Sequence, residues 1–130
     1  LLRRPEAAAQ VIADLRQIGV CIALDDFGTG YASIGYLRQL SFDRLKIDRG
    51  FIQGLASDSK AGEMVAAIVA LARALGLEIT AEGVETQEQA QAARLAGCTR
   101  LQGWLYGRPM TAEAFADTWV VASGADARAN

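Results

Sequence analysis

Acidic and basic side chains stand at the ends of short apolar runs in this sequence. Asp25 and Asp26 follow the run 20–24, and Lys46 lies within the run 44–48. Carboxylate oxygens are the ligands that Mg²⁺ and Mn²⁺ prefer, so paired aspartates that converge at a strand end can hold a divalent cation. Asp26 can equally well cap the turn that follows it. Lys46 can bind a phosphate or orient a water, or it can simply extend to solvent.

Two later runs end in the same way. Glu82 and Glu85 follow the apolar run 77–81, and Gln102 ends the weaker run 99–102. Each glutamate can bind a metal or act as a general base, or it can favour the N-terminus of the next helix through the helix dipole. Gln102 can assist at such a site or be an ordinary surface amide. Because all of these groups lie at the ends of apolar runs, a common site is favoured over four separate structural roles.

Composition removes several classes of function. The 130 residues contain no histidine, which excludes Ser-His-Asp triads and histidine metal ligands. The net charge of −2 and the pI near 5.1 argue against a DNA-binding protein. Cys21 and Cys98 match no metal or redox spacing, and the apolar run around Cys21 predicts a reduced, buried thiol. The apolar run 64–72 is too short to cross a membrane.

The elements that must position these side chains alternate along the chain. Pro5 begins a first helix that covers 7–18, and Gly19 ends it. Strands are expected at 20–24, 44–48, 77–81 and 99–102, the first buried on both faces, and helices at 31–40, 60–75, 86–96 and 112–121, with a loop at 51–59. We expect one domain over 1–122 and a disordered tail over 123–130.

Alternating strands and helices predict an α/β fold with a parallel sheet and right-handed crossovers. A small open sheet would satisfy this pattern. However, functional groups at the C-terminal ends of successive strands are typical of a TIM-like (β/α) barrel. Such a barrel needs about 250 residues, so four βα units preceded by one helix amount to about half of it.

Four ordered motifs resemble those of EAL domains, the cyclic-di-GMP phosphodiesterases with a TIM-like barrel. They are Leu-Asp-Asp-Phe-Gly-Thr-Gly-Tyr at 24–31, Leu-Lys-Ile-Asp at 45–48, Ala-Glu-Gly-Val-Glu-Thr at 81–86 and Gln-Gly-Trp-Leu-Tyr-Gly-Arg-Pro at 102–109. The likeness runs from about residue 5 to residue 115. By itself, the Gly-Thr-Gly segment would be weak evidence for a phosphate site.

The resemblance implies a role for each matching residue. Asp25, Asp26 and Glu82 would be ligands of two Mg²⁺ or Mn²⁺ ions, with Glu82 alternatively a general base. Lys46 would hold or polarise the attacking water, and Gln102 would assist at the metal-water site. Residues at the substrate, or in the mobile loop beside it, would be Phe27, Gly28, Thr29, Gly30, Arg108 and Pro109. Asp48 and Glu85 would support the metal ligands.

The signature Glu-Ala-Leu segment and several further ligands of the family have no counterpart here, so the chain resembles units five to eight of the barrel. We expect the C-terminal half of an enzyme that hydrolyses cyclic di-GMP to linear pGpG. The alternatives are an inactive module that binds cyclic di-GMP or a protein partner, and an inactive half-barrel fragment. Exposed barrel edges predict a homodimer or other self-association.

Further domains of the same protein are expected to accompany this one. The free thiols, the lack of a signal sequence and the nucleotide substrate predict a cytoplasmic domain, whether or not the parent protein is anchored in a membrane.

Overall fold

The computed structural model describes residues 5–28, 34–55 and 57–120. Its centre is a four-stranded parallel sheet in the order β1-β2-β3-β4. The strands are β1 (Ala23–Phe27), β2 (Arg44–Ile47), β3 (Glu78–Ala81) and β4 (Arg100–Leu101). The helices are α1 (Pro5–Gln17), α2 (Ile34–Gln39), α3 (Arg49–Gly54), α4 (Ser59–Ala74), α5 (Gln87–Ala96) and α6 (Ala112–Phe115), which continues as the π-helical turn η1 (Ala116–Val120). The predicted α/β fold with parallel strands and one preceding helix is confirmed.

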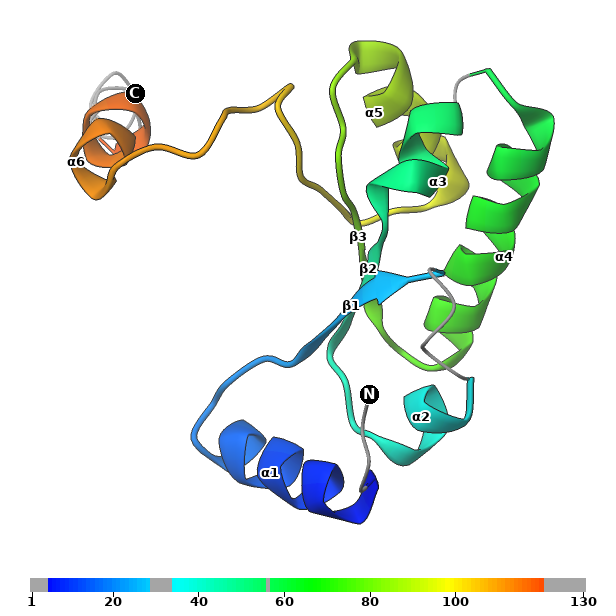
Figure 1. Cartoon of the computed structure of the whole chain (residues 1–130), viewed down its shortest axis with the longest axis vertical. Helices are drawn as coiled ribbons and strands as arrows, with labels where there is room; N and C mark the ends of the chain where they lie inside the picture. Colours follow the sequence, from blue (N-terminus) through cyan, green and yellow to red (C-terminus); the bar gives the residue numbers. More distant parts are fainter. Residues whose placement is uncertain (1–4, 29–33, 56, 121–130) are drawn as a thin grey trace, which may run out of the picture.

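The two faces of the sheet differ sharply. Side chains alternate along a strand, so Leu45 and Ile47 of β2 and Ile79 of β3 point to one face, where they are fully or almost fully buried. They pack against α3, α4 and α5, which lie together on that side of the sheet (Figure 1), and Val65 of α4 is buried there. The residues between them carry mostly charged and polar side chains to the other face, called here the open face. The core is therefore one-sided.

Side chains and a glycine cap the ends of α4 and α5. Asp58 caps α4, its carboxylate accepting from the Lys60 N–H at 2.9 Å. Thr86 and Gln89 form a capping box at the start of α5, which satisfies backbone donors that have no partner within the helix. Gly97 ends α5 in the left-handed conformation, which costs glycine little.

The first strand differs from its prediction. Pairing begins at Ala23 rather than at residue 20 and continues through Asp25 and Asp26 to Phe27. Val20 is 42% exposed, and Cys21 is also exposed, so the expected two-sided burial and the buried thiol at Cys21 are wrong. The physical reason is position, because β1 is an edge strand of this sheet and the helices cover only one face.

Other element boundaries also need correction. Residues 51–54 of the expected loop belong to α3, because Asp48 leaves β2 and caps this helix by accepting from the Gly50 N–H at 2.8 Å. The helix expected over 112–121 begins as predicted after Thr111 but changes to π-helical geometry at Ala116.

Several sequence predictions fall outside the described residues. They concern Thr29, Gly30, the start of the helix expected at 31–40 and the tail 123–130. The domain boundary at 122 stays a prediction. Among the helices that the structure describes, none has the length and apolarity needed to cross a bilayer.

Candidate active site

A β-bulge brings two carboxylates together at the end of β1. Leu24 pairs with Leu45 and Phe27 pairs with Ile47, so β1 has one residue more than β2 in this interval. In a regular strand, Asp25 and its neighbour would point to opposite faces. The bulge removes that alternation because its second aspartate takes a left-handed φ of 53°.

Lys46 of β2 joins the first aspartate of the bulge to β3. Its Nζ lies 3.0 Å from both carboxylate oxygens of Asp25 and 2.5 Å from Oε1 of Glu82. The Lys46 side chain is 21% exposed and that of Glu82 is 16% exposed, whereas that of Asp25 is 59% exposed. The Lys46 ammonium group therefore bridges carboxylates at the ends of β1 and β3.

These contacts fix the protonation of the pair at neutral pH. Partial burial opposes ionisation of Asp25, but hydrogen bonds from Lys46 and from the Asp26 N–H, together with the charge of Lys46, outweigh burial and lower the pKa of Asp25. Burial also disfavours the charged form of Lys46, but the carboxylates of Glu82 and Asp25 outweigh it and raise the pKa of Lys46. Lys46 is therefore an ammonium group that donates hydrogen bonds and cannot accept a proton in this arrangement.

Three carboxylates form a group suited to a hard cation. One oxygen each from Asp25, Asp26 and Glu82 lies within 4.8 Å of the others. Carboxylate groups carry negative charge when ionised, and Lys46 contacts two of the three. Oxygen ligands with this charge suit Mg²⁺ or Mn²⁺. The geometry therefore fits a divalent cation.

A groove of about 1120 Å³ adjoins this group. Asp26 and Glu82 lie at its acidic end, and the segment after β4 supplies aromatic side chains. The guanidinium carbon of Arg108 lies 4.4 Å from the centre of the Trp104 ring, which is cation–π geometry. Residues that line the groove include Asp26, Glu82, Gln102, Trp104, Arg108 and Trp119.

The predicted site residues fall into two groups. Beside the acidic group, Gln102 follows β4, and its N–H donates to the Ala81 carbonyl at 2.8 Å, which places its exposed side chain next to the end of β3. Asp48, Glu85, Arg108 and Pro109 line the groove together with it. Phe27 instead is buried in the core.

Gly28 also has a structural explanation of its own. Its φ is +108°, and a Cβ there would collide with the ring of Phe51, so the close approach of these segments requires glycine.

Sequence reasoning missed Arg49 and the full extent of the aromatic groove. Arg49 lines the groove immediately after Asp48, and its basic character directly after a predicted strand end was a usable signal. Trp104 and Arg108 are four residues apart, but outside a helix this spacing predicts no contact. Trp119 reaches the groove from η1, and no local pattern indicates that placement.

A parallel sheet with acid, lysine, acid and amide at its C-terminal edge is the arrangement that a (β/α) barrel has at its functional face. The family model described as EAL domain matches residues 1–109, and the chain belongs to the EAL domain family. The expected resemblance is thereby confirmed, including its restriction to the C-terminal half of the domain.

Relatives with known names support this assignment. The chain is 52% identical over 112 residues to the bifunctional diguanylate cyclase/cyclic di-GMP phosphodiesterase MucR of Pseudomonas aeruginosa, covering 86% of this chain and 16% of MucR. It is 47% identical over 120 residues to the cyclic di-GMP phosphodiesterase PdeL of Escherichia coli, covering 92% of this chain and 33% of PdeL. The chain therefore spans a minor part of these relatives, which contain additional sequence.

Solved structures show the same partial coverage. The MucR phosphodiesterase in complex with c-di-GMP has a TM-score of 0.79 and 51% identity, covering 88% of this chain and 46% of that one. BlrP1 of Klebsiella pneumoniae, solved with manganese and cyclic di-GMP, has a TM-score of 0.75 and 30% identity, covering 83% of this chain and 28% of that one. The chain is thus a partial barrel of this family.

Proposed function

We propose that this chain is the C-terminal half of a domain that hydrolyses cyclic di-GMP to linear pGpG. The observation that carries the proposal is the bridging of Asp25 and Glu82 by Lys46 at the ends of three adjacent strands. The names of MucR and PdeL support the substrate and the reaction.

Asp25, Asp26 and Glu82 are the residues of this chain that would hold the two divalent cations, the complex of BlrP1 with manganese being consistent with this. Bound Mg²⁺ or Mn²⁺ supplies charge neutralisation at a phosphodiester and a water of lowered pKa. The remaining ligands of such a site come from outside this chain.

Lys46 and Gln102 act on water and substrate in this proposal. The ammonium of Lys46 donates hydrogen bonds, so it orients carboxylates and stabilises negative charge at the reacting phosphate rather than removing a proton. Gln102 presents an amide to the groove, where it can donate to a phosphate oxygen or to water.

The test mixes the purified chain with the separately produced first half of the MucR EAL domain, cyclic di-GMP and Mn²⁺, and separates the products by chromatography. We expect pGpG from the mixture and none from the chain alone. Glu82→Ala should abolish the product, whereas Glu63→Ala, which changes an exposed glutamate of α4, should not. Equal activity of the two variants, or no product from a complex that has formed, would contradict the proposal.

Binding without hydrolysis is the second candidate, and the aromatic groove favours it because the Trp104 ring and the Arg108 guanidinium group can contact a base and a phosphate directly. Cyclic di-GMP titrated into the chain in the presence of EDTA tests this alternative. Binding that Trp104→Ala weakens, combined with an inactive assembled domain, would support it.

A further inference from the structure

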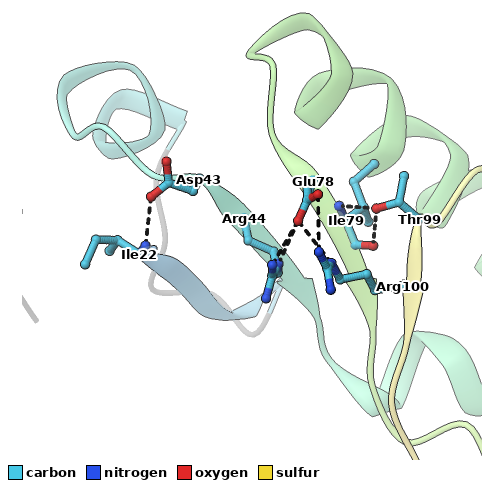
Figure 2. Close-up of polar contacts among 7 residues, drawn as sticks. All are labelled: Ile22, Asp43, Arg44, Glu78, Ile79, Thr99 and Arg100. Atoms are coloured by element: carbon cyan, nitrogen blue, oxygen red, sulfur yellow. Dashed lines mark hydrogen bonds and ion pairs between the residues drawn. The ribbon is translucent and has the colours of Figure 1, made fainter. Parts of the chain in front are cut away.

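A second charged cluster lies on the open face, at the opposite end of the strands from the candidate active site. Glu78 accepts from Arg44 at 2.9 Å and 3.2 Å and from Arg100 at 3.0 Å (Figure 2). Arg44 begins β2, Glu78 begins β3 and Arg100 begins β4. We call Arg44, Glu78 and Arg100 the basic layer, because two cationic side chains share a single carboxylate.

The basic layer and the candidate active site share the open face. Arg44 lies two residues before Lys46, and Glu78 lies four residues before Glu82, so each pair points to the same side of its strand. Arg44 is 29% exposed and Arg100 is 54% exposed in this chain. Arg44, Lys46 and Arg100 also line a hollow of about 460 Å³ on this face.

Closure of a barrel would bury this layer. The strands of an eight-stranded barrel enclose an interior that side chains fill completely. The chain covers 46% of the solved MucR domain, so the rest of such a domain must cover the open face. A guanidinium group keeps its proton in proteins, and burying one without a countercharge is costly. Two guanidinium groups that share the single carboxylate of Glu78 therefore favour a further acid beside them.

A second copy of this chain does not supply that acid. All strands of a closed barrel of this kind run in the same direction, so two copies would place their basic layers at the same height. Arg44 and Arg100 of one copy would then face their counterparts, which would double the excess of cations in that layer.

We propose that the open face binds βα units of a different sequence, which complete the barrel and insert an aspartate or glutamate side chain between Arg44 and Arg100. The inference concerns assembly and is independent of hydrolysis. The inserted carboxylate would lie at the level where β2 and β4 begin.

The test measures binding of the chain to the first half of the MucR EAL domain by titration, with stoichiometry from light scattering. We expect one copy of each, and we expect Arg44→Glu and Arg100→Glu each to weaken the affinity roughly 30-fold or more. Arg94→Glu makes the same charge change on the exposed surface of α5 and should leave the affinity unchanged. Circular dichroism of each variant alone checks that it folds.

A rescue experiment identifies the acid. Inward-facing aspartates and glutamates of the first half are changed to arginine one at a time, and one of them should restore binding of the Arg100→Glu variant. Equal weakening by Arg94→Glu, no weakening by the two layer variants, or a stable dimer of this chain that excludes the first half would overturn the inference. A complex that forms as expected but hydrolyses nothing would support it and contradict only the proposed function.

Discussion

Lys46 sets the charge balance at the strand ends. It is the one cation in contact with Asp25 and Glu82 among the interactions seen in the described part of the chain. An ammonium in this position neutralises carboxylates that would otherwise attract a divalent cation more strongly. Lys46 therefore orients these acids, and it would compete with a divalent cation for them.

Replacing Lys46 by methionine tests this competition. Removal of the ammonium makes the acidic group more negative, so Mn²⁺ should bind roughly 3- to 30-fold more tightly, as Coulomb's law at a partly exposed site suggests. Electron paramagnetic resonance of free Mn²⁺ measures the affinity. Lys60→Met, at the exposed start of α4, is the matched control and should change nothing. Weaker Mn²⁺ binding by Lys46→Met would show that orienting the acids outweighs competing for them.

Glu78 makes the stability of the chain depend on acid pH. Hydrogen bonds from Arg100 and Arg44 lower the pKa of Glu78 below its ordinary value of 4.5. A carboxylate with a lowered folded-state pKa stabilises the fold above its unfolded-state pKa, and this contribution disappears as the pH falls through the folded-state value. The difference in unfolding free energy between wild type and Glu78→Gln should therefore be largest near pH 7 and shrink below about pH 4.5. Urea titrations across this pH range measure the two unfolding free energies. A difference that stays the same at every pH would contradict the prediction.

At the scale of elements, the alternation of strands and helices was predictable from the sequence, because the apolar runs and the residues that flank them indicated the same element boundaries. The α5 helix shows this agreement, since Thr86 and Gly97 mark its ends both in the sequence and in the structure. The α3 helix was missed because it contains two glycines in six residues, Gly50 and Gly54, which indicate a loop. Its formation depends on the Asp48 cap and on burial of Ile52.

The sequence indicated which residues belong to the candidate site but did not indicate their geometry. Acids and a lysine at successive strand ends pointed to one edge of the sheet. The bulge that makes Asp25 and Asp26 converge was not predictable, because it depends on register with β2 rather than on local sequence. The basic layer had a usable signal, since Arg44, Glu78 and Arg100 each lie an even number of residues before a predicted site residue.

The two cysteines should differ in reactivity because Cys21 is exposed and Cys98 is buried. Cys98 follows α5 and is 7% exposed, and burial, only partly offset by the charge of Arg73, raises the pKa of its thiol to about 11. Cys21 is exposed ahead of β1. A disulfide reagent at pH 8 should therefore label one thiol quickly, and Cys21→Ser should remove that fast phase. The second thiol should react only when urea unfolds the chain, and two fast phases in the native chain would contradict this assignment.

At the scale of the whole molecule, the segment formed by α6 and η1 carries exposed apolar side chains. The α6 helix and η1 stand apart from α3, α4 and α5 (Figure 1). Phe115 is 52% exposed and Trp119 is 46% exposed, and their spacing of four residues puts them on the same side of this segment. Apolar side chains gathered in this way favour burial against a partner.

Tryptophan fluorescence should report that burial, because the sequence has two tryptophans and both are exposed, Trp104 by 57% and Trp119 by 46%. The isolated chain should emit like tryptophan in water, and adding the first half of the MucR EAL domain should shift the emission to shorter wavelength as the segment packs. Trp119→Phe should remove most of this shift, and Trp104→Phe should retain it. Short-wavelength emission from the isolated chain, or an unchanged spectrum in a complex that elutes as one species, would mean that the apolar side of α6 and η1 does not contribute to assembly.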